Sequence, residues 1–269
     1  SLMSLGVWAL LWLVVQMQAR MGAESGASAT PLQRALLGGG RAWPSWLVGL
    51  LLVWALTLLA AGSAATASRT GALQWVLMIV LLVLWRDTSG CLAVGLAVIG
   101  LLLYALAGWM LPALLLDWTG FTTDGVFARL ASDPQSMGSR RELWANALYL
   151  IAQKPWTGWG WGELDYAHYI TLFPGERFSV LLDNAHNLPL HLAVELGLPV
   201  AAVACGAVVA WVVRARPWQE TDAVRQLAWG ALAIIGLHSM VEFPLWYGPF
   251  QLVTVLALAL LCRRALLGW

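Results

Sequence analysis

The sequence predicts an all-α membrane protein, built as a multi-spanning helical bundle of about seven spans. Of its 269 residues, 60% are hydrophobic and 11% are charged, and the mean hydropathy is +0.74. Soluble domains carry about 25% charged residues, so this chain has too few charges to cover a globular surface. The net charge of +1 indicates no broad nucleic-acid-binding surface.

Seven apolar segments are candidate transmembrane spans, because a span needs about 20 apolar residues. The third and sixth are short for a full crossing. The first has neither an initiator methionine nor a basic leader, so it is not a signal peptide, and we expect the chain to be a fragment that lacks earlier spans. The segments are residues 1–18, 44–62, 71–85, 91–112, 188–213, 226–241 and 247–262.

The distribution of arginine predicts the orientation of these spans. If the 19–43 segment is cytoplasmic, every other arginine-rich connection is cytoplasmic too, and the short outer loops hold Arg69 alone. This is a strong positive-inside bias. The predicted spans and their orientation together divide the chain into N-terminal spans (1–112), a large outer loop (113–187) and C-terminal spans (188–269).

The outer loop of about 75 residues carries eight acidic and five basic residues, which is too long and too mixed in charge for a simple connector. Within it, residues 139–155 are predicted to form an amphipathic helix. Ser139 and Glu142 match a capping box, and Pro155 and Gly158 end the helix. An apolar arc follows at helical spacing, formed by Leu143, Trp144, Ala147, Leu148, Leu150 and Ile151. The glycine-rich run at 155–163 lacks the ending of a phosphate-binding loop, and we expect a tight aromatic turn at the bilayer surface.

Arg140 falls at the centre of the apolar arc, and Arg141 lies at its edge. Two interpretations remain open. The side chains can reach lipid phosphates from an otherwise apolar face. Alternatively, they form an anion site with the free amides of the helix N-terminus. Arg69, at the outer end of another span, has the same two interpretations.

His186 lies just before a predicted helix that Asn187 can cap and whose first turn tolerates Pro189. The field of a helix N-terminus disfavours imidazolium, so His186 is a candidate general base. A histidine that only hydrogen-bonds the loop backbone is the alternative.

Two histidine–glutamate pairs have i, i+4 spacing, which places each pair on one helix face. For His191 and Glu195, inside the membrane, a structural lock is favoured over catalysis. For His238 and Glu242, in a helix expected to end at Pro244, a second polar patch and a helix-end brace are both open. The three cysteines have no metal-ligand spacing, and no metal or other cofactor is predicted.

Three stretches together resemble the bacterial O-antigen ligase and polymerase superfamily, and most of all its protein O-oligosaccharyltransferases, which glycosylate pilins. These are SRRELWANALYLIAQKPWTGWGWGE, DNAHNLPLHLAVELGLP and HSMVEFPLWY, and ASRTG at the end of an earlier span is also similar. The resemblance covers roughly residues 60–250. It implies a GT-C-like fold in the bacterial inner membrane, with the large loop and the active site on the periplasmic face.

The resemblance also implies a glycosyltransferase that uses a lipid-linked donor and no metal. The glycan would pass from undecaprenyl diphosphate to Ser or Thr hydroxyls of a periplasmic protein such as pilin, with inversion. His186 would be the essential histidine, acting as the catalytic base, and Arg69 and Arg140 would bind the donor diphosphate, with Arg141 as a neighbour that could share this role. Asn187, Glu195, His238 and Glu242 would support the site.

Two alternatives to this function remain open. Within the superfamily, the acceptor could be lipid A core or a growing O-antigen chain. A different class, a transporter or lipid flippase, would use the histidine–glutamate pairs for ion coupling. Against transport, most polar residues gather at one outer face rather than near the midplane.

Overall fold

The structure is a computed structural model that describes residues 2–24, 45–66, 68–120, 134–180 and 182–266. Throughout these residues the chain forms helices and turns, with no strand. The all-α prediction is therefore confirmed. The 19–43 segment, whose Arg34 and Arg41 bear on the predicted orientation, lies largely outside the described residues.

Each of the seven apolar segments corresponds to a helix. Two helices, Arg86–Thr119 and the stretch Leu188–Gln219, are long and apolar enough to cross a membrane. Others are shorter apolar helices, so seven complete spans stay a prediction. The helices are α1 (Leu2–Glu24), α3 (Ser45–Ala65), α4 (Arg69–Leu84), α5 (Arg86–Thr119), α9 (Leu188–Ala215), α10 (Ala223–Ser239) and α11 (Gly248–Leu266).

The 113–187 region, which the sequence predicts to be an outer loop, contains α7 (Pro134–Gln153) and α8 (Leu164–Ile170). Because α7 begins at Pro134, Ser139 lies inside the helix, and the predicted capping box is wrong. Proline suits the first turn of a helix, where its missing N–H has no partner to lose. The apolar arc is largely confirmed: Leu148 is 56% exposed, whereas four members are buried, namely Leu143, Ala147, Leu150 and Ile151.

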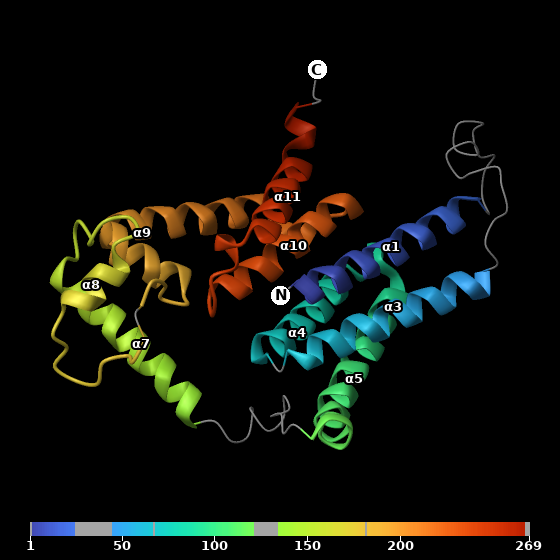
Figure 1. The fold of residues 1–269 in the computed structure, drawn as a ribbon. Helices are drawn as coiled ribbons and strands as arrows, with labels where there is room; N and C mark the ends of the chain where they lie inside the picture. Colours follow the sequence, from blue (N-terminus) through green and yellow to red (C-terminus); the bar gives the residue numbers. More distant parts are fainter. Residues whose placement is uncertain (1, 25–44, 67, 121–133, 181, 267–269) are drawn as a thin grey trace.

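The buried side chains form two separate hydrophobic cores. One core lies among α1, α3, α4, α5 and α10 and includes Leu56, Trp75 and Ile234. The other lies among α7, α8 and the first part of α9 and includes Leu150 and Val194. In Figure 1, α7, α8 and the first part of α9 are separated from α1, α3, α4 and α5, and α9 runs from them toward α10 and α11, where Val212 and Ala215 pack against the first core.

Helix α9 is broken at Gly197, which has a φ of 83°. The glycine-rich run covers this break: Trp159 N donates to Val194 O at 2.9 Å and Leu198 N to Pro155 O at 2.8 Å. A Cβ on Gly158 would lie 2.3 Å from Glu195 O, so the two backbones meet too closely for a side chain. The run therefore satisfies backbone groups that the break leaves open.

Polar contacts join the helix ends at one end of the bundle. Trp85 Nε1, after α4, donates to Pro217 O at 2.8 Å. Gln226 Nε2, near the start of α10, donates to Thr88 Oγ1 at 3.2 Å. Charge patterning predicts this end to be cytoplasmic, and the residues of the candidate site lie at the other ends of α9 and α10.

Candidate functional site

Three side chains from distant parts of the sequence meet beyond the C-terminal end of α10. Arg140 Nη2 donates to Glu242 Oε1 at 3.0 Å. His186 Nε2 lies 3.7 Å from the other carboxylate oxygen, Oε2. The structure thus brings Arg140 and His186, two of the residues predicted for the site, to one carboxylate. We call this group the Arg140–Glu242–His186 cluster.

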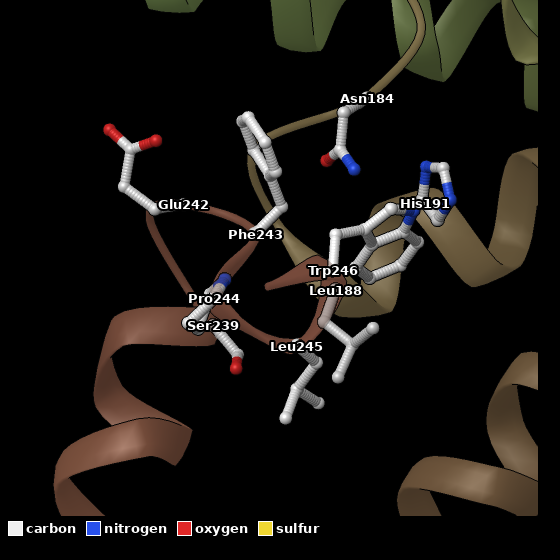
Figure 2. Close-up of a pocket in the computed structure, with 9 residues that line it drawn as sticks. All are labelled: Asn184, Leu188, His191, Ser239, Glu242, Phe243, Pro244, Leu245 and Trp246. Carbon is white, nitrogen blue, oxygen red and sulfur yellow. The ribbon is translucent and has the colours of Figure 1, made fainter. Parts of the chain in front are cut away.

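Glu242 reaches the cluster because α10 ends earlier than the sequence predicts. The helix stops at Ser239, not at Pro244, and Glu242 N closes a last turn on His238 O at 2.9 Å. The chain then enters a short 3-10 turn, Pro244–Trp246. Figure 2 shows the Glu242 side chain directed away from the turn that Pro244, Leu245 and Trp246 form.

The expected face shared by His238 and Glu242 is therefore absent. His238 packs its ring against Phe250, with the ring centroids 5.5 Å apart, while Glu242 turns to Arg140 and His186. The physical reason is that Glu242 lies beyond the last residue of α10, where i, i+4 spacing no longer determines which side chains meet.

The backbone of His186 has a φ of +50°, in the left-handed region where few non-glycine residues are found. Its N–H donates to Asn184 Oδ1 at 3.1 Å. Its ring Nδ1 lies 3.1 Å from the carbonyl oxygen of Asn184. A carbonyl oxygen can only accept, so Nδ1 carries the hydrogen and the lone pair of the neutral ring is on Nε2, which faces Glu242.

Asn187 caps α9, as the sequence predicts: Leu190 N donates to its Oδ1 at 3.0 Å, and proline follows in the first turn. The same side chain donates from Nδ2 to Met240 O at 2.9 Å. Asn187 therefore fixes the start of α9 against the chain that leads from α10 to Glu242.

The cluster is open to a ligand. The side chains of Arg140, His186 and Glu242 retain 40%, 32% and 35% of their exposure, so each has a free face. One side is closed by Phe243, whose ring meets the His186 ring edge-on at 4.9 Å. A half-exposed cation, an imidazole and a carboxylate within one another's reach can bind an anion and move a proton.

The other two arginines predicted for the site lie on α4 and α7. Arg69 is the first residue of α4, in the helical group of α1, α3 and α5. Arg141 follows Arg140 on α7 but lines a different cavity, together with Glu142 and Glu176. Arg140 contacts the cluster's carboxylate directly.

His191 and Glu195 form the expected i, i+4 pair inside α9. Their Nε2 and Oε2 atoms are 3.4 Å apart, and both side chains are almost fully buried. The His191 ring also meets the ring of Trp246 edge-on at 4.9 Å (Figure 2). Backbone amides of Gly162 and Leu164 lie against the Glu195 carboxylate. These contacts tie α9 to the loop and to the turn after α10, as a structural lock would.

Asn184 and Phe243 are members of the site that sequence reasoning did not assign. Asn184 is 4% exposed and holds the His186 backbone and ring. An asparagine two residues before a histidine is a signal for a side-chain turn, so the sequence did contain a clue. For metals, no group of three or more His, Cys, Asp or Glu side chains in the described part of the chain could hold an ion.

The fold and the site together define an all-helical membrane protein with a polar cluster where the region that contains α7 and α8 meets the end of α10. The chain belongs to the O-antigen ligase family, whose model matches residues 51–205, more than half of its length. A second model, the C-terminal part of virulence factor membrane-bound polymerases, matches residues 226–267.

Among curated proteins, the chain is similar to a general O-oligosaccharyltransferase from Acinetobacter baylyi. The two are 26% identical over 220 residues, which cover 77% of this chain and 35% of that protein. The chain thus spans about a third of the length of this relative. No solved structure matches it significantly.

Proposed function

We propose that this chain is the glycan-transferring part of an O-oligosaccharyltransferase. It would move a glycan from undecaprenyl diphosphate to a Ser or Thr hydroxyl of a periplasmic protein. The family match and the relative support the reaction class. The observation that carries the proposal is the meeting of Arg140, Glu242 and His186, which combines an anion-binding group with a base.

His186 acts as the general base in the proposed reaction. The Asn184 carbonyl holds the hydrogen on Nδ1, which leaves Nε2 to take the proton of the acceptor hydroxyl. The hydroxyl oxygen forms a bond to the anomeric carbon as the bond from that carbon to the diphosphate oxygen breaks. The electron pair leaves with the diphosphate, and a single displacement inverts the anomeric carbon.

Glu242 has two partners in turn. In the structure, Glu242 Oε1 pairs with Arg140 Nη2 at 3.0 Å. During the proposed reaction, a diphosphate oxygen would take this place on the guanidinium. A diphosphate carries more charge than a carboxylate and can displace it from the guanidinium. Glu242 is then free to pair with the imidazolium that forms at His186, 3.7 Å away. Arg140, released to the donor, neutralises charge on the leaving diphosphate.

Arg69 and Arg141 remain proposed helpers in binding the donor, Arg69 from the start of α4 and Arg141 from the turn of α7 that carries Arg140. Asn187, Glu195 and His238 are proposed to hold the helix ends around the site. The two groups of spans, 1–112 and 188–269, are proposed to flank a periplasmic loop at 113–187, in the bacterial inner membrane.

Polymerisation of glycan chains is the second candidate, because residues 226–267 match the C-terminal model of membrane-bound polymerases. Both reactions use the same donor chemistry and differ in the acceptor hydroxyl, which belongs to a protein in one case and to a sugar in the other. Ligation to lipid A core differs in the same way.

The test is to express the chain in bacteria that make a lipid-linked glycan, export a pilin and carry lipopolysaccharide. Intact-protein mass spectrometry would follow the pilin, and gel electrophoresis would follow the lipopolysaccharide and free glycan chains. A glycan-sized mass gain on the pilin supports the proposal. Glycan on lipopolysaccharide or longer chains would contradict the protein acceptor, and no transfer to any of the three would contradict the reaction class.

A further inference from the structure

A cavity of about 400 Å³ lies between α7 and residues 173–176, beside the proposed donor-binding residues and separate from the Arg140–Glu242–His186 cluster. Its volume is within the range of roughly 300–1,000 Å³ that is usual for small-ligand sites. We call it the α7 cavity. Its main lining side chains are Arg141, Glu142, Asn146, Tyr149, Phe173 and Glu176.

The two walls of the α7 cavity are fastened to each other. Asn146, which is 3% exposed, donates from Nδ2 to Glu176 O at 3.0 Å and accepts from Phe178 N at 2.9 Å. At the other end, the rings of Tyr149 and Phe173 lie 5.6 Å apart. The cavity is therefore already formed without a ligand, which lowers the cost of ordering it on binding.

The lining combines polar groups with aromatic rings. The side chain of Glu176 hydrogen-bonds Glu142 and raises the pKa of Glu142, because the pair is more stable when it shares a proton. Together with the guanidinium of Arg141, the two carboxyl groups give the lining both hydrogen-bond acceptors and hydrogen-bond donors, which suits a polar ligand with many hydroxyl groups.

Sugars have the properties that this lining can recognise. Their hydroxyl groups donate hydrogen bonds, which the carboxyl oxygens of Glu142 and Glu176 can accept, and they accept hydrogen bonds, which Arg141 can donate. The less polar face of a sugar ring can pack on Tyr149 or Phe173, since aromatic side chains bury large apolar surfaces.

We propose that the α7 cavity is a subsite for a sugar unit of the transferred glycan, an inference that rests on the proposed function. Arg141 at its rim follows Arg140 directly, and consecutive helix residues point about 100° apart around the axis. A donor whose diphosphate binds Arg140 can thus extend its glycan around the same turn of α7 into the cavity.

The test measures glycan binding by saturation-transfer NMR on the full chain in detergent. The probe is the oligosaccharide that mild acid releases from the lipid-linked glycan of the producing cells. The variants are a double change, Glu142→Gln with Glu176→Gln, and Tyr149→Leu. The control is Asp117→Asn, an exposed acidic residue at the end of α5. A lysine-rich peptide serves as a second probe, for a basic acceptor segment.

We expect the wild type and Asp117→Asn to bind the oligosaccharide equally. The double variant and Tyr149→Leu should each bind it about tenfold more weakly, as the loss of charged hydrogen-bond acceptors or a stacking ring implies. Unfolding temperatures check that each variant is folded. Equal binding by all variants, no binding by the wild type, or a loss confined to the peptide would overturn the proposal.

His186→Asn separates this subsite from the reaction. It should bind the oligosaccharide as the wild type does while losing transfer. If it transfers glycan normally, the proposed role of His186 fails although the subsite stands. If the cavity variants bind the glycan normally while transfer depends on His186, the proposed sugar subsite is contradicted and the proposed function stands.

Discussion

At the scale of single residues, Glu242 connects the two groups that the reaction needs. Its carboxylate contacts the guanidinium of Arg140 through one oxygen and faces the imidazole of His186 through the other. A carboxylate in this position competes with the donor for Arg140 and also compensates a positive charge on His186. Binding and turnover should therefore respond in opposite ways to its removal.

Replacing Glu242 with glutamine should tighten donor binding and slow transfer. The neutral amide releases Arg140 to the diphosphate, so KM for the lipid-linked donor falls, whereas kcat falls by about tenfold or more because the imidazolium loses its counter-charge. Steady-state transfer at several donor concentrations separates the two constants. The matched control is Glu220→Gln, which breaks the 2.6 Å pair with Arg225 elsewhere in the chain and should leave both constants unchanged. An unchanged kcat in Glu242→Gln would contradict this role.

The burial of His168 in α8 leads to a prediction about how the stability of the fold depends on pH. The ring is 1% exposed, and burial followed by the charge of Arg177 lowers its pKa from the ordinary value of 6.5. Because the folded pKa is below the unfolded one, its contribution to stability is complete above about pH 6.5 and is lost as the pH falls below that value.

The unfolding temperature of the wild type should thus decrease between pH 7 and pH 5 more than that of His168→Phe, which has no proton to gain. Thermal unfolding in detergent, followed by circular dichroism at several pH values, measures the difference. Parallel pH curves for the two proteins would show that His168 is not the titrating group.

At the scale of elements, much of the secondary structure follows from hydropathy, since each apolar segment is a helix in the structure. What hydropathy does not predict is where helices break or end. Helix α9 changes direction at Gly197 because the loop at 155–163 hydrogen-bonds its open backbone groups, and α10 ends at Ser239. These are tertiary contacts, which local periodicity does not contain.

The site was predictable in its residue types but not in its contacts. Arg140 stood out because a charge lies within an apolar arc, and His186 because it precedes a capped helix. Their common partner, Glu242, is 102 residues from Arg140 in sequence. Its i, i+4 spacing from His238 indicated a helix face that the early end of α10 removes. Only the three-dimensional path of the chain after α10 brings the carboxylate to the two residues.

Removal of the Asn187 cap tests whether the contact between the start of α9 and the chain after α10 has a function beyond stability. Asn187→Ala removes the cap and the bond to Met240 O, and should cost about 0.5–2 kcal/mol of stability together with most of the transfer activity. The control is Asp222→Ala, since Asp222 caps α10 by accepting from Val224 N at 2.9 Å.

Asp222→Ala should lose a similar amount of stability and retain activity, because α10 begins at the other end of the bundle from the cluster. Thermal unfolding and a transfer assay on both variants provide the comparison. Equal losses of activity in the two variants would mean that Asn187 acts through stability alone.

At the scale of the whole molecule, the proposed topology places the cluster and the 134–180 region outside the cytoplasm. Two helices are long and apolar enough to cross a membrane, and contacts among Trp85, Thr88, Pro217 and Gln226 gather helix ends at the opposite side. Labelling of single cysteines can determine the sidedness directly.

In a chain whose own cysteines are replaced by serine, Ser179→Cys should react with a membrane-impermeant maleimide in cells with a permeable outer membrane. Asp87→Cys should react only after the inner membrane is opened. Both positions are exposed, so accessibility within the protein does not limit either reaction. The reverse pattern would place the cluster on the cytoplasmic side and contradict a periplasmic acceptor.

The most direct test of glycan transfer by this cluster is the transfer rate of His186→Asn. Asparagine tolerates the left-handed backbone found at residue 186 and removes the base, so the fold is retained while the chemistry is lost. His168→Phe serves as the histidine control, and the intact mass of the acceptor protein is followed over time. We predict a rate at least about 100-fold below that of the wild type for His186→Asn and a normal rate for His168→Phe. Full-rate transfer by His186→Asn would contradict the proposed mechanism.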